Sequence, residues 1–452
     1  MNSLITGRSR HTHTGRRLRA ALVALTATGI ACGSVAVGAA AAAPRATRSS
    51  VAPITVWVDG TRLPMVKAWE KANPSVKLNV VTFDGGANGS GSIESKVALF
   101  NRVGHGWPDI VFSTEQNDVQ TLGAAPFNFP AVLNNGLVPK SVINNYATGA
   151  LSPCYIGNKL ECLRNDLAFD VLWVDAPLMK QFGYKVPTTW QQWQAIGESV
   201  AKHHPGYIIG TLGDSYDDAI YLQAAQCHLN DLVSPYTVLD NPADPNCVNM
   251  ANLLNPLLKD KSVPVVSVFA STFPKDYGGK VLMMEGPAWY GADLFESSTG
   301  LNMPKGTLEA APPLTWAGSS QTWTGDVGGG LWIMSSHTTQ PQAVAKVLVG
   351  LATSEASQGI SVGYPGYVPD AVPWIAAQDA SGYYASPLAP VFAKAATEVW
   401  TGWSQTRWDV FGLWASNVTP NLVEGDTVTS QLAVMGTAIS NYAQSDGFQV
   451  IK

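Results

Sequence analysis

Short apolar runs alternate with amphipathic segments in the first part of the chain. The β-rich run at 54–58, the alternating run at 76–83 and the short apolar run at 108–112 each predict a strand. Between them, apolar residues recur at helical spacing in 63–74 and 93–103. The order strand, helix, strand, helix, strand is typical of βαβ units and predicts a mostly parallel sheet.

The same alternation starts again further along the chain. Apolar runs predict strands at 167–174, 206–212, 280–285 and 327–335. Helical spacing predicts helices at 186–204, 219–229, 248–258 and 340–354, and the chain from about Ser386 reads as all helix. We therefore expect two α/β lobes. Each is assembled from separated parts of the chain, because the later strands must return to a sheet already begun.

The first 49 residues have a different character. They contain seven arginines and no acidic residue, and an apolar run, ALVALTATGIACGSVAVGAAAAA, fills 21–43. A basic start, an apolar stretch and small residues at its end are typical of an export signal. We therefore exclude 1–49 from the fold and expect an exported protein. GRRLRA, at 15–20, loosely resembles a twin-arginine signal, so the Sec and twin-arginine routes both stay open.

Two kinds of processing fit this segment. GIACGS, at 29–34, partly resembles a lipoprotein signal in which Cys32 would be lipidated, although Gly29 stands where Leu is usual. The alternative is cleavage near Ala43, which leaves no anchor. The sequence therefore predicts a protein on the extracellular face of the membrane, lipid-anchored or secreted.

The charge balance changes once the export signal is set aside. Seven of the 28 basic residues lie in it and none of the 33 acidic ones, so the remainder has a formal net charge of −12. An acidic protein is a poor candidate for binding nucleic acid or an anionic membrane surface. No later segment has the length and purity of a membrane span. The 15 Trp are many for this length, and surfaces that bind sugars use Trp.

Four of the five cysteines lie beyond the export signal in two close pairs. In an exported protein this spacing predicts short-loop disulfides Cys154–Cys162 and Cys227–Cys247. Buried free thiols are the alternative. A zinc site is less favoured, because only His228 accompanies the cysteines and it is a single neighbour.

Local catalytic signatures are missing from the sequence. It has no G-x-S-x-G elbow and no H-E-x-x-H motif, and GANGSG at 86–91 lacks the spacing of a phosphate or dinucleotide loop. Asp217 and Asp218 could be glycosidase acids or calcium ligands, but adjacent acids at a helix start more often complement the helix dipole. A hydrolase stays possible, because glycosidases often show no local motif.

Polar and aromatic residues follow several of the predicted strands. Ligands of open α/β sheets bind beyond the carboxyl ends of strands. The candidates in these positions are Asp59, Arg62, Asp84, Glu115, Gln116, Trp289 and Tyr290. Carboxylates and Arg can hydrogen-bond neighbouring hydroxyls in pairs, and an aromatic ring can cover the C–H face of a sugar. The set therefore predicts a sugar site.

At this point a resemblance covers the chain from Ile54 to Asp370. ITVWVDG, AWEKANPSVKLNVV, GHGWPDIVFS, DVLWVDAPLMKQFGYKVPTTWQQW, KVLMMEGPAWYG, GGGLWIMSSHTTQPQAVAKVLVGLATSEASQ and GYPGYVPD occur in one order. In that order they resemble an extracellular solute-binding protein of an ABC importer, in the sugar-binding family that includes maltodextrin-binding proteins. No single segment is specific to this family, but the occurrence of all seven segments in this order is.

The resemblance implies a periplasmic-binding-protein-like α/β fold with two lobes, a ligand cleft and three hinge crossovers. We place the crossovers near Arg164–Phe169, Ala311–Gly328 and Gly363–Pro369. The N-terminal lobe would then comprise 50–166 plus 326–365, and the C-terminal lobe 167–325 plus 366–452. Closure of the two lobes by hinge motion would enclose the ligand.

The resemblance also implies a function. The protein would be a monomer that captures a sugar or oligosaccharide and delivers it to the permease subunits of an ABC importer, without catalytic residues, cofactor or metal. Position and residue type add Trp323, Tyr364 and Trp408 to the binding candidates. The family commonly has Gly-Pro-Trp where this chain has Gly-Pro-Ala-Trp, so Tyr290 is considered beside Trp289.

Two alternatives remain. A secreted carbohydrate-active hydrolase would have the same Trp content and export signal. The same fold could also bind a non-sugar solute such as a polyamine.

Overall fold

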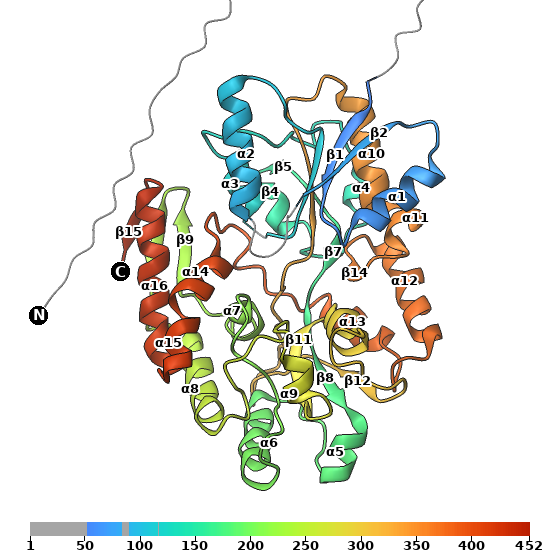
Figure 1. The fold of residues 1–452 in the computed structure, drawn as a ribbon. Helices are drawn as coiled ribbons and strands as arrows, with labels where there is room; N and C mark the ends of the chain where they lie inside the picture. Colours follow the sequence, from blue (N-terminus) through green and yellow to red (C-terminus); the bar gives the residue numbers. More distant parts are fainter. Residues whose placement is uncertain (1–51, 84–89, 116) are drawn as a thin grey trace, which may run out of the picture. The chain divides into compact units, whose positions relative to one another are not determined.

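The computed structural model describes residues 52–83, 90–115 and 117–452 (Figure 1). Ala52–Lys452 forms one compact unit. The predictions for the export signal, Cys32, Asp84 and Gln116 concern residues outside the described set. None of the described helices combines the length and apolar character that a membrane span needs.

The first of two main sheets, sheet 1, has five strands in the order β2-β1-β3-β13-β6. Its strands are β1 (Ile54–Val58), β2 (Leu78–Thr82), β3 (Ile110–Ser113), β6 (Leu163–Arg164) and β13 (Leu331–Met334). The first three are parallel to one another, as the βαβ pattern predicts, whereas β13 runs antiparallel to β3 and β6. Helices α1 (Leu63–Ala72), α2 (Ser90–Val103), α10 (Pro341–Thr353) and α11 (Glu355–Gln358) accompany this sheet.

Sheet 2 has three strands in the order β11-β8-β12. These are β8 (Asp170–Asp175), β11 (Met283–Pro287) and β12 (Leu308–Ala311). Both pairings are antiparallel, so the prediction of mostly parallel sheets is wrong for this part. The strand β11 also includes Gly286 and Pro287, because Pro287 pairs with Asp170 at the edge of the sheet. An edge position tolerates a proline, which has no N–H to donate to a neighbouring strand.

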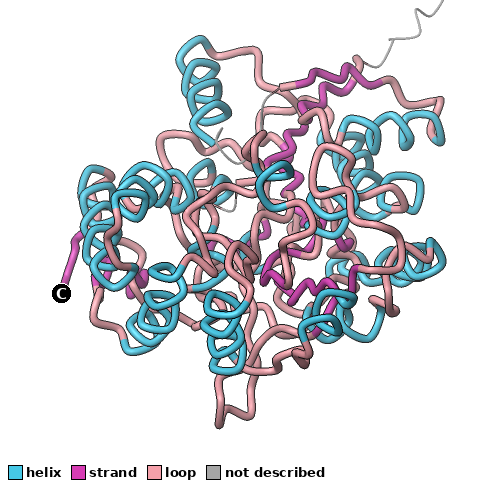
Figure 2. Tube along the Cα trace, turned by 60° about the horizontal axis from the view of Figure 1, so that its bottom comes forward, coloured by secondary structure: helices cyan, strands magenta, loops and turns pink. Residues whose placement is uncertain are grey.

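Helices lie around sheet 2, and a smaller sheet packs against the helix at 428–445. The helices are α5 (Ala176–Phe182), α6 (Trp190–His203), α7 (Asp217–Tyr221), α8 (Pro245–Asp260), α9 (Phe273–Tyr277) and the π-helix η2 (Gly291–Glu296). The smaller sheet joins β9 (Asn230–Ser234), β10 (Thr237–Asp240) and the C-terminal β15 (Gln449–Ile451) in the order β15-β10-β9. Figure 2 shows the helices lying around the strands.

Two of the secondary-structure predictions for this region are wrong in part. The segment 206–212 forms only an isolated bridge between Ile208 and Val281 instead of a strand, because the next amide, of Ile209, bonds to the loop carbonyl of Ser262. The helix predicted at 219–229 is the short α7, and the turns that follow it lead to Gln226, whose φ is +57°.

The C-terminal part is mainly helical, as predicted, and ends differently. It contains α12 (Val368–Ser381), α13 (Ala389–Ala395), α14 (Val410–Asn417), α15 (Thr419–Glu424) and α16 (Val428–Ser445). The segment 396–409 is not helical, and the chain closes with the strand β15. Shorter elements complete the described chain: α3 (Asp118–Leu122), α4 (Lys140–Ile143), η1 (Ser152–Cys154), β4 (Tyr155–Ile156) and β5 (Lys159–Leu160).

Three segments connect the parts around sheet 1 and sheet 2. The first and third meet where β7 (Asp166–Leu167) pairs with β14 (Tyr364–Pro365). The second is fixed by Asp326, whose carboxylate accepts from the Arg164 guanidinium at 2.7 Å and from the Ala168 amide at 2.8 Å. Gly329, at φ +71°, lies so close that a Cβ would overlap the same guanidinium. The crossovers are therefore tied to one another by a buried ion pair.

Candidate ligand-binding site

A cavity of about 990 Å³ lies where the two main sheets face one another. We call it the central cavity. Sheet 1 contributes residues that follow the carboxyl ends of β1, β2 and β3, which is where α/β sheets bind ligands. Its lining includes Asp59–Arg62, Phe83 and Thr114 from this side, Gly213–Tyr216, Ser267, Phe269, Trp289, Asp293 and Phe411 from the other, and Val327–Gly329 from the second crossover. The volume is at the upper end of the roughly 300–1,000 Å³ of small-molecule sites.

Arg62 brings a positive charge into the central cavity from the sheet 1 side, with Asp59 beside it and Asp293 contributed by η2 on the other side. Asp59 accepts from the Arg62 amide at 2.7 Å and lies 3.5 Å from the Arg62 guanidinium, which stands over the Phe112 ring. Burial raises the pKa of Asp293, while the nearby charge of Arg62 acts to lower it. The guanidinium supplies donors and the two carboxylates supply acceptors, a combination that suits pairs of hydroxyl groups.

The opposite side positions a third acid, Asp214. Its carboxylate accepts from the Ser267 hydroxyl and, at 3.0 Å, from the Val268 amide. Burial raises the pKa of Asp214 to about 6, although both of these hydrogen bonds act to lower it. The two hydrogen bonds therefore fix the orientation of the Asp214 carboxylate, and its pKa lies close to neutral pH.

Aromatic rings form the rest of the opposite wall. Trp289 follows β11, and its indole Nε1 donates to the Val327 carbonyl at 3.0 Å. The ring of Phe269 lies 5.9 Å from the Trp289 ring at an interplanar angle of 20°, and Tyr216 meets Trp289 edge-on at 5.9 Å. Phe269 is 53 % exposed, so it can cover a ligand that enters the cavity. Flat apolar faces of this kind suit the C–H faces of sugar rings.

The fold is shared with proteins of known structure. One is an ABC transporter-associated binding protein from B. animalis subsp. lactis Bl-04 in complex with beta-1,6-galactobiose, with a TM-score of 0.72, 16% identity and coverage of 89% of this chain and 100% of that one. Another is the galacto-N-biose-/lacto-N-biose I-binding protein of Bifidobacterium longum, with a TM-score of 0.70, 18% identity and coverage of 89% and 99%. The chain has the periplasmic-binding-protein fold.

A third structure with this fold is the maltose-bound MalE3 of T. maritima, with a TM-score of 0.63, 14% identity and coverage of 86% of this chain and 99% of that one. No protein-family model and no curated protein matches the sequence. The likeness therefore lies in the two-lobed α/β architecture, which the sequence predicted, and the central cavity lies between the halves of that architecture.

Within this fold, three of the residues predicted to bind ligand line the central cavity. They are Asp59, Arg62 and Trp289. Tyr290 does not reach it, because its side chain is fully buried, packs against Gly286 and donates to the Tyr216 hydroxyl at 3.2 Å. Of the two aromatics after Pro287, the fold thus presents Trp289 to the cavity and places Tyr290 in the core.

The other described candidates lie elsewhere in the fold. Glu115 and Trp408 are 1 % and 2 % exposed and meet at a separate small cavity of about 30 Å³. Burial, reinforced by the charge of Asp118, raises the pKa of Glu115 to about 9. Tyr364 packs edge-on against Phe169 beside the crossovers, and Trp323 lines a further pocket described below.

Several residues of the central cavity had no signal in the sequence. Tyr216, Phe269 and Asp214 come from irregular segments before α7 and α9, where neither strand nor helix periodicity points to one face. Asp293 lies in the π-helix η2, just after the aromatics of the strand end. In the sequence, only the short spacing between Trp289 and Asp293 could have indicated that Asp293 lines the same cavity.

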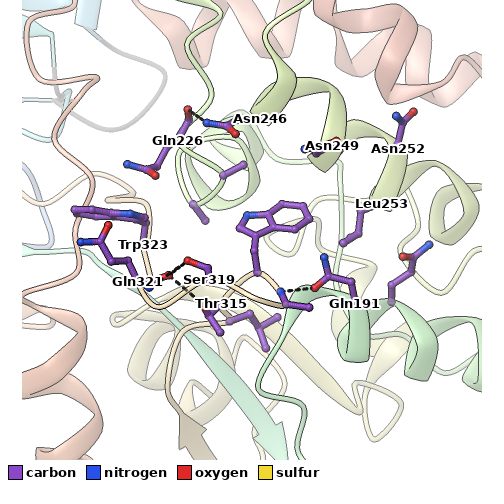
Figure 3. Close-up of a pocket in the computed structure, with 16 residues that line it drawn as sticks. Gln191, Gln226, Asn246, Asn249, Asn252, Leu253, Thr315, Ser319, Gln321 and Trp323 are labelled. Carbon is purple, nitrogen blue, oxygen red and sulfur yellow. Dashed lines mark hydrogen bonds between the residues drawn. The ribbon is translucent and has the colours of Figure 1, made fainter.

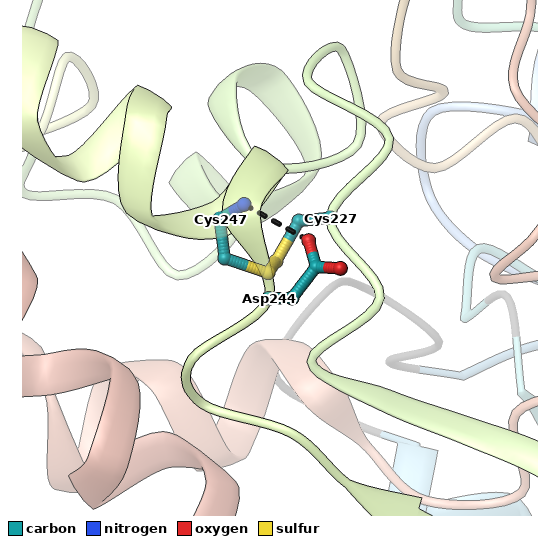
Figure 4. Close-up of side chains that lie close together, drawn as sticks. All are labelled: Cys227, Asp244 and Cys247. Carbon is teal, nitrogen blue, oxygen red and sulfur yellow. Dashed lines mark hydrogen bonds between the residues drawn. A yellow bond between two sulfur atoms is a disulfide. The ribbon is translucent and has the colours of Figure 1, made fainter.

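The cysteines form the two predicted disulfides, Cys154–Cys162 and Cys227–Cys247. Cys227, Cys247 and Asp244 lie close enough together to resemble a metal site (Figure 4). The disulfide uses both sulfur atoms, however, and Asp244 caps α8 by accepting from the amides of Asn246 and Cys247. The cluster is therefore a structural link between the segment after α7 and the start of α8.

Proposed function

We propose that this protein captures a sugar or oligosaccharide in the central cavity, outside the cytoplasm, and delivers it to the permease of an ABC transporter. The observation that carries the proposal is the pairing of two walls in one cavity. The aromatic wall of Trp289 and Phe269 lies across the cavity from the polar pair Asp59 and Arg62, and Asp293, one turn after Trp289, adds a carboxylate. One covers C–H surface and the other pairs with hydroxyls, and a sugar has both.

The charge of the cavity supports a neutral ligand over an anion. Asp59, Asp214 and Asp293 outnumber Arg62, so phosphate or another anion would meet net repulsion. The three structures with this fold bind galactobiose, lacto-N-biose and maltose, as their descriptions state, which agrees with a neutral saccharide. A polyamine would satisfy the acids but would leave the guanidinium of Arg62 next to another cation.

Delivery requires that the bound state differ from the free state. We assign 50–166 plus 326–365 to one lobe and 167–325 plus 366–452 to the other, with the buried Arg164–Asp326 pair at the crossovers between them. Closure about these crossovers would bring the two walls of the central cavity onto the ligand and create the surface that a permease recognises. A monomer suffices for this cycle.

A thermal-shift screen tests the proposal. The purified protein is heated with mono- and oligosaccharides, and with spermidine as the alternative ligand. A true ligand stabilises by RT ln(1+[L]/Kd), about 2.7 kcal/mol at a hundredfold excess over Kd. Stabilisation by a neutral saccharide supports the proposal, and stabilisation by spermidine alone contradicts it. Analysis of the incubated saccharides for shortened products separates a binding protein from a hydrolase.

We also propose that the protein is exported and that Cys32 carries its lipid anchor. The basis is the signal-like segment and the single cysteine left outside the two disulfides. Cys32→Ala should release the protein from cells to the medium, with Cys154→Ala as the cysteine control that leaves the anchor intact. A mature N-terminus mapped between Ala40 and Thr47 would show ordinary cleavage and no lipid.

A further inference from the structure

A second cavity, of about 680 Å³, lies beside sheet 2 and away from the central cavity (Figure 3). We call it the amide pocket. Its walls are the start of α6, the segment after α7, one face of α8, and the loop at 314–323 that follows β12. It shares no lining residue with the central cavity.

The chemistry of the amide pocket is unusual in having no ionisable side chain among its sixteen lining residues. Seven of them are carboxamides: Gln191, Gln194, Gln226, Asn246, Asn249, Asn252 and Gln321. A carboxamide offers a donor and an acceptor side by side, which matches a hydroxyl that both donates and accepts. The pocket has no charge that would compensate an anion or a cation, so its ligand is neutral.

Two tryptophans add flat apolar surface to these amides. Trp316 and Trp323 are both half-buried, so part of each ring is open to the pocket. Trp316 is backed by the core ring of Trp190, whose centroid lies 6.4 Å away. Figure 3 shows Gln321 beside Trp323, with Gln226 and Asn246 nearby. A stacking surface bordered by amides suits a sugar ring better than an apolar ligand.

The pocket is held in place by specific contacts. The Cys227–Cys247 disulfide joins the residues next to Gln226 and Asn246, and the Asn246 amide donates to the Gln226 carbonyl at 3.1 Å. Gln226 itself has a φ of +57°, a conformation that is unfavourable for a residue with a side chain. On the other wall, the Gln191 side chain accepts from the Ala317 amide at 2.9 Å and fixes the loop. The walls are therefore set before any ligand arrives.

Several polar groups of the pocket have no use in the fold itself. Within the described residues, the side chains of Gln226, Asn249 and Gln321 and the indole Nε1 of Trp316 and Trp323 make no hydrogen bond. On α8, Asn246, Asn249 and Asn252 recur every third residue and so share one face. Asn is a poor helix former, so this row is better explained by what it binds than by helix stability.

We propose that the amide pocket is a second binding site, for a neutral oligosaccharide, which acts independently of the central cavity. The carboxamides would bond the hydroxyl groups, and Trp316 and Trp323 would stack on the rings. Such a site would hold the protein on a glycan while the central cavity takes up its own ligand. The inference rests on the lining of this pocket and not on the function proposed for the central cavity.

Fluorine NMR of protein labelled with 5-fluorotryptophan tests this inference. The signals of Trp316, Trp323 and Trp289 are assigned with Trp→Phe variants. The probes are maltotetraose, cellotetraose, xylotetraose and chitotetraose, with a proline-rich peptide as the alternative ligand. We expect at least one tetrasaccharide to shift the Trp316 and Trp323 signals saturably, and to do so equally well in Trp289→Ala, which removes a ring of the central cavity only.

Asn249 and Gln321 are exposed, so variants at these two positions keep the test independent of folding. Asn249→Ala combined with Gln321→Ala should weaken this binding, and Trp323→Ala should weaken it about tenfold, as the loss of one stacked ring implies. Gln444→Ala, an exposed amide on α16, should change nothing. The inference is wrong if no tetrasaccharide shifts either signal at concentrations on the order of 10 mM, enough to saturate a millimolar site. It is also wrong if only the peptide shifts them, or if Trp289→Ala abolishes the shifts.

Discussion

The position of Trp289 in the central cavity allows the effect of removing its indole to be worked out. The ring lies nearly parallel to Phe269, and its Nε1 donates to Val327 in the second crossover. Trp289 therefore has two roles, as a surface for the ligand and as a link between the strand end and the crossover. We expect Trp289→Ala to weaken sugar binding and also to lower the stability of the free protein.

The two effects have different magnitudes. Loss of some tens of Å² of contact with a sugar, at about 25 cal/mol per Å², costs on the order of 1–2 kcal/mol, or about a tenfold loss of affinity. Truncation of a fully buried Trp costs about 3–5 kcal/mol, and the half-buried Trp289 should cost about half of that. The lost hydrogen bond to Val327 adds about 1 kcal/mol. The free energy of unfolding should therefore fall by about 2–4 kcal/mol.

Two further variants separate these roles. Trp289→Phe keeps an aromatic face and removes the indole N–H, so it should bind sugar better than Trp289→Ala while still losing the bond to Val327. Phe269→Ala removes a side chain that is 53 % exposed, so it should leave the unfolding free energy nearly unchanged. Its affinity should still fall, because its ring forms part of the same wall.

Isothermal titration calorimetry with the saccharide that most stabilises the wild-type protein measures the affinities. Urea unfolding without ligand measures the stabilities, and the titration is run where each variant is folded. If folded Trp289→Ala and Phe269→Ala both bind the saccharide as tightly as the wild-type protein, the aromatic wall does not contact the ligand. The function proposed for the central cavity would then lose its main support.

Three other outcomes follow from the structure. Asp326→Asn should lower the unfolding free energy by about 3–5 kcal/mol in urea, because it leaves the buried Arg164 guanidinium without its partner; a change below about 1 kcal/mol would show that the pair is not desolvated. Burial raises the pKa of Glu285 from 4.5 to about 8, so the native state keeps a proton that the unfolded state releases and stability falls as pH rises between those values. The unfolding free energy of Glu285→Gln, measured in urea, should therefore rise relative to that of the wild type as the pH increases from 5 to 8. The same pH dependence in both proteins would contradict this. Replacing Cys227 and Cys247 together by Ala should cost about 3 kcal/mol, as loops of this size imply, and an unchanged melting temperature would refute it.

The regular elements of the fold could be predicted where one periodicity dominates. The strand β1 and the helix α10 match the ranges predicted from apolar spacing closely. The segment 206–212 looks like a strand from its composition, but strand formation needs a partner, and a single bridge at Ile208 is what the neighbouring chain provides. Pairing depends on the tertiary structure, which the local pattern does not contain.

The candidate site was predictable only in part for a related reason. Asp59, Arg62 and Trp289 follow strands, and strand ends converge in this type of fold. Residue type does not reveal burial, however, so Tyr290 and Trp408 looked like candidates although both lie in the core. Aromatic residues serve a core and a binding surface equally well, and only packing separates the two uses.

The last strand of the chain, β15, affects the order in which the protein can be built. β15 pairs with β10, about two hundred residues earlier, and Lys452 forms an ion pair with Asp240. The small sheet beside α8 and α16 therefore cannot be completed until Gln449–Ile451 has left the ribosome. Sheet 1 could close sooner, since its last strand ends at Met334. A translating chain would thus carry a complete sheet 1 and an incomplete small sheet until β15 has emerged.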